Sequence, residues 1–216
     1  VIDAEYITTL QAKGETVVVI AKKINDTYKI IGYIKIADQL RSTSVQAVKR
    51  LKSMGIEVMM LTGDNYATAT AIARQVGITN YRAEVLPQDK AAEIERIRNS
   101  GKFIAMVGDG INDAPALAAA DVSFAIGSGS DIAIETADIT LVRNDLMSVA
   151  DAVSLSKKTL DKIRQNLFFA FIYNVLGIPL AAVGLLNPVI AATAMAMSSV
   201  SVVANSLLLK KWRPNS

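Results

Sequence analysis

The feature that most constrains this 216-residue chain is a stretch from Gln165 to Leu209 that contains no charged side chain. These 45 residues are too many for one core helix of a globular domain. They suffice for two helices of about 20 residues, the length that crosses a hydrocarbon core of roughly 30 Å. We therefore predict two membrane-spanning helices, 167–186 and 189–209, which are separated at Asn187-Pro188 because proline ends one helix and starts the next.

The charges around this stretch are unevenly placed. All 20 acidic residues lie at or before Asp161, and the net charge of +3 belongs to the tail, 210–216. Basic residues flank the predicted spans on both sides, which places both ends of the hairpin in the cytoplasm by the positive-inside bias: Lys157, Lys158, Lys162 and Arg164 before, and Lys210, Lys211 and Arg213 after. The polar start of the chain is unlike a signal peptide. Because the remainder is neutral, we expect no nucleic-acid partner.

Two residue types are absent from the composition. The chain has no cysteine and no histidine. This excludes a disulfide scaffold, a zinc site built on these ligands and a catalytic triad.

The neutral part alternates short apolar runs with helix-like stretches. Strands are predicted at 17–21, 30–36, 57–61, 103–107, 122–126 and 139–142, and helices at 43–54, 66–76, 88–99 and 114–120. This alternation predicts an α/β fold with a parallel sheet and right-handed crossovers. Ligands of such sheets bind at the carboxyl ends of the strands.

Polar residues follow two of these strands. Thr62-Gly63-Asp64 ends one strand, Gly108 to Asp113 ends another, and Lys90 opens a helix between them. A hydroxyl, a lysine and two carboxylates, Asp109 and Asp113, can together hold a phosphoryl group and a hard cation such as Mg²⁺. The alternative is a set of ordinary turns, with Asp113 as the N-cap of the next helix. The polar residues occur in order along the chain, at strand ends, and this favours a phosphoryl-transfer site.

The segments MLTGDN and GDGINDAPALAAADVSFAIGSGSDIAIETADI strongly resemble the phosphorylation domain of P-type ATPases, which belong to the haloacid dehalogenase-like superfamily. The resemblance covers essentially the whole chain and implies ATP and Mg²⁺ as cofactors. It implies that Thr62 and Gly63 contact the phosphoryl group, Lys90 neutralises it, Asp109 binds Mg²⁺, Asn112 and Asp113 complete this network, and Asp64 lies at the hinge toward the nucleotide-binding domain.

The chain departs from the family at one point. It contains no DKTG motif, whose aspartate is the family's nucleophile. By the resemblance, the missing strand lies between the Thr62 strand and the Asp109 strand, so the sheet is expected to be incomplete and the fragment alone inactive. The implied organisation is the end of a nucleotide-binding domain (1–36), the phosphorylation domain (37–150), a cytoplasmic linker helix (151–166), two transmembrane helices (167–209) and a basic tail (210–216).

The predicted spans carry a few polar side chains. Tyr173 and Asn174 lie in the first, and Met195 and Ser199 lie one turn apart in the second. Counted from the turn, Asn174 and Ser199 have similar depths and can face each other. A thioether suits Cu(I), and neither span offers an acidic side chain or histidine for a proton, Ca²⁺ or Zn²⁺. The alternative is that these polar groups only hold the helices together.

The YN and MxxSSxS patterns resemble the last two helices of copper-transporting ATPases, whereas zinc pumps carry charged residues there. This implies that Tyr173, Asn174, Met195 and Ser199 form part of a Cu(I) path. It also implies a multi-pass protein, in the plasma membrane of a prokaryote, that exports copper(I) at the expense of ATP. The implied partners are the rest of the pump (nucleophile segment, actuator domain and other transmembrane helices) and a copper chaperone.

Three alternatives to a copper pump stay open. The first is a pump for silver or another soft metal. The second is an inactive or regulatory fragment. The third is a membrane-anchored phosphatase, which would need its own DxD nucleophile, and we find none at a credible position.

Overall fold

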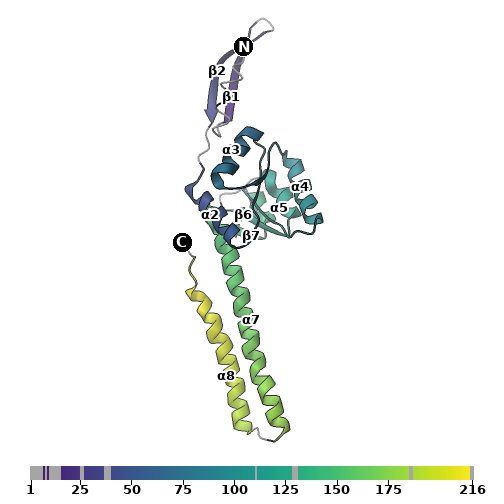
Figure 1. Cartoon of the computed structure of the whole chain (residues 1–216), viewed down its shortest axis with the longest axis vertical. Coiled ribbons are helices and arrows are strands. Elements are labelled where there is room, and N and C mark those ends of the chain that lie inside the picture. Colours follow the sequence, from purple (N-terminus) through teal and green to yellow (C-terminus); the bar gives the residue numbers. More distant parts are fainter. Residues whose placement is uncertain are drawn as a thin grey trace. The chain divides into compact units, whose positions relative to one another are not determined.

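The computed structural model describes residues 7, 9, 16–24, 27–36, 40–109, 111–127, 131–184 and 187–214. It divides into two compact units, Val1–Ala150 and Asp151–Ser216. The described strands all lie in the first unit, and the second consists of helices (Figure 1).

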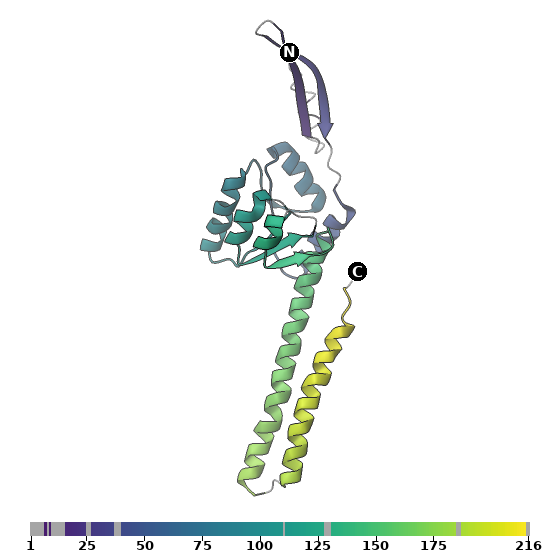
Figure 2. The ribbon, with the colours of Figure 1, turned by 180° about the vertical axis from the view of Figure 1, so that it is seen from behind.

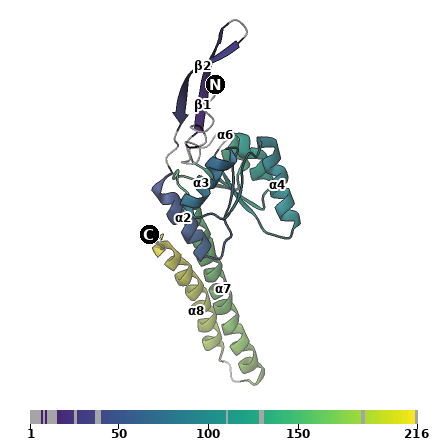
Figure 3. The same cartoon turned by 45° about the horizontal axis from the view of Figure 1, so that its top comes forward.

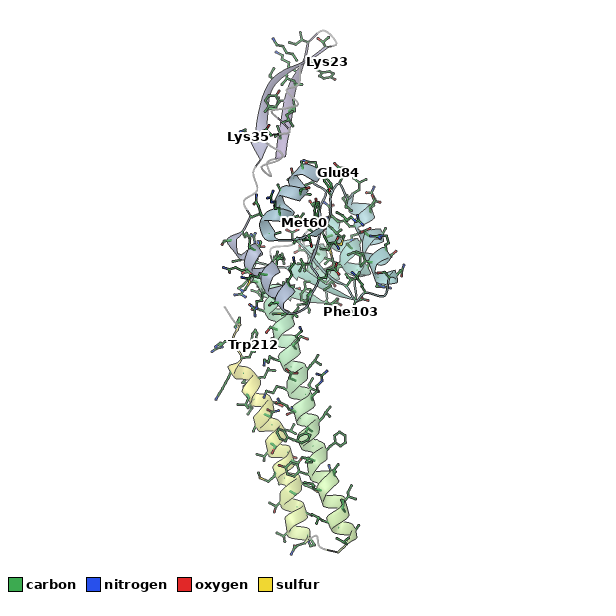
Figure 4. The ribbon with its side chains drawn as sticks, in the orientation of Figure 1. Lys23, Lys35, Met60, Glu84, Phe103 and Trp212 are labelled. Atoms are coloured by element: carbon green, nitrogen blue, oxygen red, sulfur yellow. The ribbon has the colours of Figure 1, made fainter. Side chains whose placement is uncertain are left out.

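The first unit begins with an antiparallel hairpin of β1 (Thr16–Ile24) and β2 (Thr27–Ile36), with a register shift between Ile20 and Ala21. Both predicted strands are confirmed and are longer than expected, and residues 25 and 26 between them lie outside the described residues. Figure 4 marks this hairpin with Lys23 and Lys35. Its apolar side chains are largely exposed, as at Ile31, which is 62% exposed. An isolated two-stranded ribbon of this kind is marginal in water.

The α/β part alternates strands and helices as predicted (Figure 3). Its elements are α2 (Ser42–Ser53), β3 (Met59–Leu61), α3 (Tyr66–Val76), β4 (Asn80–Arg82), α4 (Pro87–Asn99), β5 (Ala105–Gly108), η1 (Ile111–Asp113), α5 (Ala114–Ala119), β6 (Val122–Ile126), α6 (Asp131–Thr136) and β7 (Ile139–Leu141). Sequence analysis missed β4, because its three residues include two polar side chains and carry no apolar run.

The parallel sheet is present in two pieces. β3 pairs with β4, and β5 pairs with β6, which pairs with β7, all in parallel. Within the described residues, no ladder joins β3 to β5. A haloacid dehalogenase-like sheet without its nucleophile strand is expected to break at this position.

Local sequence signals explain several helix boundaries. The Asn65 side chain caps α3 by accepting from the Thr68 N–H at 3.0 Å, and α3 ends at Gly77, whose φ of 76° suits glycine. Pro87 stands in the first turn of α4, where its missing N–H costs nothing. Val48, Ala73, Val76 and Ile78 then form a buried cluster that fixes α2 and α3 around β3.

Asp138 and Ser123 link β6 to the start of β7. The Ser123 hydroxyl and N–H donate to Asp138 Oδ2 at 2.7 and 2.8 Å, and the Asp138 N–H donates to Ser123 Oγ at 3.0 Å. The bonds from the Ser123 hydroxyl and then its N–H hold the pKa of Asp138 below its ordinary value. Such a carboxyl stabilises the fold above the unfolded-state pKa, near 4, and loses its contribution as the pH falls through the lower folded-state pKa.

We therefore expect the free energy of unfolding of Asp138→Asn to depend less on pH at acid pH. The urea midpoint of the first unit should depend less on pH between about 4 and 2 than in the unaltered chain, as measured by pulse proteolysis. Glu95→Gln, at an exposed position of α4, is the control and should keep the original slope. An unchanged slope in Asp138→Asn would contradict this role.

The second unit is a helical hairpin of α7 (Met147–Ala182) and α8 (Pro188–Leu207), followed by η2 (Leu208–Lys211). Figure 2 shows α7 and α8 side by side. The predicted linker helix and the first predicted span are parts of the single helix α7, which contains Pro179. Asn187 caps α8, with Oδ1 accepting from the Val189 N–H at 2.9 Å. Two helices among the described residues, Met147–Ala182 and Ala191–Lys211, are long and apolar enough to cross a membrane.

Candidate functional site

The loop after β3 is held by the neighbouring loop after β4. The Thr62 hydroxyl donates to Asp64 Oδ2 at 2.8 Å and accepts from the Asp64 N–H at 3.1 Å. The N–H of Glu84 donates to the Asp64 carbonyl at 2.8 Å, and that of Val85 donates to the Thr62 carbonyl at 3.0 Å. Thr62 and Gly63 are thereby fixed relative to the start of α4.

Glu84 has a backbone conformation that sequence reasoning did not foresee. Its φ is 57°, the left-handed region that non-glycine residues seldom adopt. This conformation directs two successive N–H groups toward the Thr62–Asp64 loop. Figure 4 shows Glu84 at one end of the α/β part and Phe103, which precedes β5, at the opposite end. The loop therefore lies at the end where the strands finish.

Lys90 and Asp113 join the two pieces of the sheet. Lys90 Nζ lies 2.7 Å from Asp113 Oδ1, and the two side chains are 16% and 14% exposed. Lys90 is in the first turns of α4, beyond β4, while Asp113 ends η1, beyond β5. Asp113 makes no side-chain capping bond to α5, so its carboxylate serves this pair rather than the helix N-terminus.

The loop after β5 presents further oxygen ligands. Asp109 and Asn112 are exposed, and Gly110 lies outside the described residues. A Cβ added to Gly108 would lie 2.7 Å from the Asp113 Cβ, so glycine is needed for Asp113 to approach the strand end. No group of three or more acidic side chains that could hold a metal is present within the described residues. Mg²⁺ fits what is present, because it binds through one or two carboxylates and completes its shell with water and substrate phosphate.

The polar residues of the hairpin divide between two environments. The Tyr173 hydroxyl lies 3.4 Å from Ser201 Oγ and so faces α8. Asn174 Nδ2 donates to the Ala170 carbonyl at 2.8 Å, and Ser199 Oγ donates to the Met195 carbonyl at 3.4 Å, each within its own helix. Met195 is 70% exposed. The structure therefore does not pair Asn174 with Ser199, and both face outward from the hairpin.

A different set of α8 residues faces α7. Its partly or fully buried members are mostly small: Ala191, Ala194, Ser198, Ser201, Val202 and Asn205. Small side chains let two helices approach closely in a membrane. Met195 and Ser199 stand beside this face, where other helices could reach them.

Comparison with known proteins places the chain in a family. A family model described as haloacid dehalogenase-like hydrolase matches residues 2–121, more than half of the chain, and a second matches 90–153. The chain belongs to this family. The predicted haloacid dehalogenase-like fold is thereby confirmed.

Individual curated proteins resemble the chain over nearly its whole length. The chain is 56% identical over 202 residues to a copper-exporting P-type ATPase of Bacillus subtilis, covering 94% of this chain and 25% of that protein. It is 53% identical over 210 residues to a copper-exporting P-type ATPase of Staphylococcus aureus, covering 97% and 26%. The chain thus spans about a quarter of the length of these relatives, and the predicted resemblance to a segment of such an ATPase is confirmed.

Solved structures of related ATPases also match the fold of the chain. The crystal structure of a zinc-transporting PIB-type ATPase in its E2·Pi state matches 95% of this chain and 33% of its own, with a TM-score of 0.80 and 37% identity. A catalytic CPx-ATPase domain matches 62% of this chain and 56% of its own, with a TM-score of 0.51 and 30% identity. The membrane relatives and the two apolar helices support a membrane protein.

Proposed function

We propose that this chain is part of an ATP-driven pump that moves copper(I) across a membrane through an aspartyl-phosphate intermediate. The observation that carries the proposal is the pair Lys90–Asp113, which joins the loops after β4 and β5 at one end of a phosphoryl-transfer fold, in a chain that continues into a helical hairpin without charge over 165–209. The nucleophile would come from the remainder of the pump, on a strand between β3 and β5.

Each site residue has a role in this proposal. The Thr62 hydroxyl and the Gly63 N–H would bond to phosphoryl oxygens, and Lys90 would neutralise the group. Asp109 and Asp113 would hold Mg²⁺, which supplies charge stabilisation to the transferring phosphoryl group, and Asn112 would bond to the same network. Asp64 would act at the hinge toward the nucleotide-binding domain, since its carboxylate already bonds to Thr62.

Copper(I) is favoured over zinc by the hairpin. Zn²⁺ is bound by histidine, cysteine or carboxylate, and 165–209 contains none of these. Tyr173, Asn174, Met195 and Ser199 would form part of the path, with a thioether as the soft ligand. The outward positions of Asn174, Met195 and Ser199 suit a path completed by other helices of the pump. Ag(I) is equally soft, and a chaperone is the expected copper donor on the cytoplasmic side, where both ends of the hairpin are proposed to lie.

The test is to join this chain to the upstream part of the protein, with which it would form the intact pump. We expect copper-stimulated ATP hydrolysis in the joined protein and a loss of at least 100-fold in Asp109→Ala, because the Mg²⁺ ligand is removed. Asp89→Ala, an exposed acidic control on α4, should retain activity. No copper stimulation after joining would favour an inactive or regulatory fragment, and unchanged aspartyl-phosphate formation in Asp109→Ala would reject the role of that residue.

A further inference from the structure

Four polar residues of the hairpin, none of them used by the proposed site, form a connected cluster between α7 and α8. We call Lys162, Asn166, Asn205 and Ser206 the basal polar cluster. Lys162 Nζ donates to Asn205 Oδ1 at 2.7 Å, Asn205 Nδ2 donates to Asn166 Oδ1 at 2.8 Å, and Asn166 Nδ2 donates to Ser206 Oγ at 2.8 Å. The hydrogen bonds therefore cross from one helix to the other three times in succession.

The direction of donation is the same along the whole cluster. It starts at the Lys162 ammonium, which also donates to Gln165 Oε1 at 3.0 Å, and it ends where Ser206 Oγ donates to the Val202 carbonyl at 2.8 Å. Hydrogen bonds arranged in series polarise one another and are strongest where water is excluded. Asn205 occupies the middle of the series, both accepts and donates, and is 9% exposed. An amide buried in this way is costly to leave unpaired.

The cluster lies at the end of the hairpin opposite the covalent turn. α7 ends at Ala182 and α8 begins at Pro188, so the helices are tied there by a short connection. Between the two ends, α8 turns mostly small side chains toward α7. Among the described residues there, the only polar contact between the helices is the long one, 3.4 Å, between Tyr173 and Ser201. In a bilayer, contact between apolar helices gains little from the hydrophobic effect. The cluster is therefore the second point that sets the spacing and rotation of α8.

We propose that Asn205 is a positioning residue that, through the basal polar cluster, holds α8 so that Met195 and Ser199 keep their placement relative to Asn174. Ser199 lies six residues before Asn205, or roughly 9 Å along the helix. Because the helices are tied at the turn, a splayed or rotated base would displace Ser199 in the same direction as Asn205, by a smaller amount. The inference rests on the proposed function in so far as it concerns the metal path, whereas the helix spacing can be measured independently.

The first experiment measures helix spacing in the chain embedded in lipid nanodiscs. The chain has no cysteine, so nitroxide labels are confined to introduced sites. Ile163→Cys with Leu207→Cys reports on the base, and Ile178→Cys with Val189→Cys reports on the turn; all four positions are exposed. We expect Asn205→Leu to widen and broaden the distribution of basal distances and to leave the distance at the turn unchanged.

Thr193→Val is the matched control, because this α8 hydroxyl bonds only to the Val189 carbonyl of its own helix. It should leave both distances unchanged, and the conservative Asn205→Gln should retain a narrow basal distribution. Circular dichroism of each variant verifies that the helices are formed. Basal distances in Asn205→Leu that overlap those of the unaltered chain would overturn the proposal.

The second experiment uses the intact pump. Asn205→Leu should raise the copper concentration for half-maximal ATPase activity about tenfold with an unchanged maximal rate, and Asn205→Gln should restore it. A splayed base with unchanged copper dependence would overturn the positioning role. A pump that copper does not stimulate in any form would reject the proposed function instead, while the nanodisc distances would still decide whether Asn205 spaces the helices.

Discussion

Lys90→Met should lower the free energy of unfolding of the first unit by roughly 2–3 kcal/mol, because it leaves the Asp113 carboxylate without its partner in a mostly buried position. The estimate is below that for a fully buried pair, since about one seventh of each side chain remains exposed. Urea unfolding followed by pulse proteolysis of the chain in micelles measures the change. In the intact pump, the same variant should reduce ATP turnover at least 100-fold, because the proposed counter-charge of the phosphoryl group is lost.

The chain contains a matched control for this change. Lys102 Nζ lies 2.7 Å from Glu57 Oε2, the same distance as in the Lys90 pair, but its side chain is 58% exposed and that of Glu57 is 61% exposed. Lys102→Met should therefore change the stability much less than Lys90→Met does, and it should leave turnover intact. The double variant Lys90→Met/Asp113→Leu should recover much of the stability without recovering activity, because no unpaired charge is left. Equal losses in Lys90→Met and Lys102→Met would refute the special role of the buried pair.

Gly127→Ala should destabilise the first unit by about 3 kcal/mol, at the upper end of what an added methyl group costs in a packed site. The added Cβ would overlap the Leu141 carbonyl oxygen and lie 2.8 Å from that of Val142. Both are backbone atoms at the end of β7, so no side chain can rotate away. The end of β6 must then separate from β7, and hydrogen exchange should accelerate at the paired residues Ile126 and Leu141.

Gly32→Ala is the control for this prediction. An added Cβ there meets nothing within 4 Å, and alanine is better tolerated than glycine inside a strand. Its effect should stay below about 0.5 kcal/mol. If Gly127→Ala unfolded at the same urea concentration as the unaltered chain, the close approach between β6 and β7 would not be a constraint on the fold.

Sequence reasoning recovered the elements whose signals are local. β3, β5, β6 and β7 are apolar runs of strand length, and α3 and α4 begin at recognisable signals, Asn65 and Pro87. It missed β4, because Asn80-Tyr81-Arg82 forms a strand only through its pairing with β3. It also divided α7 at the change from charged to uncharged residues, whereas helix continuity depends on backbone hydrogen bonds that continue across such a change.

The sequence predicted more about the site at the strand ends than about the site in the hairpin. The order of the loops after β3 and β5 predicted Thr62, Lys90, Asp109 and Asp113 as candidate site residues before any contact was known. The contact between Lys90 and Asp113 was not predictable, because it depends on where α4 and η1 come to lie. In the hairpin, equal depth suggested that Asn174 faces Ser199, but rotation about each helix axis decides facing, and Tyr173 takes the position toward Ser201. The polarity of Asn205 within an uncharged stretch was the available signal for the basal polar cluster.

By itself, the sequence determined the class of the protein: an alternating α/β unit with polar loops at two strand ends, followed by two helices that lack charge over 45 residues. These properties depend on residue type and spacing along the chain. Tertiary structure alone decided that Glu84 turns its N–H toward the Thr62–Asp64 loop and that Asn205 joins α8 to α7. These properties depend on backbone dihedral angles and on the rotation of packed elements, which several distant segments set together.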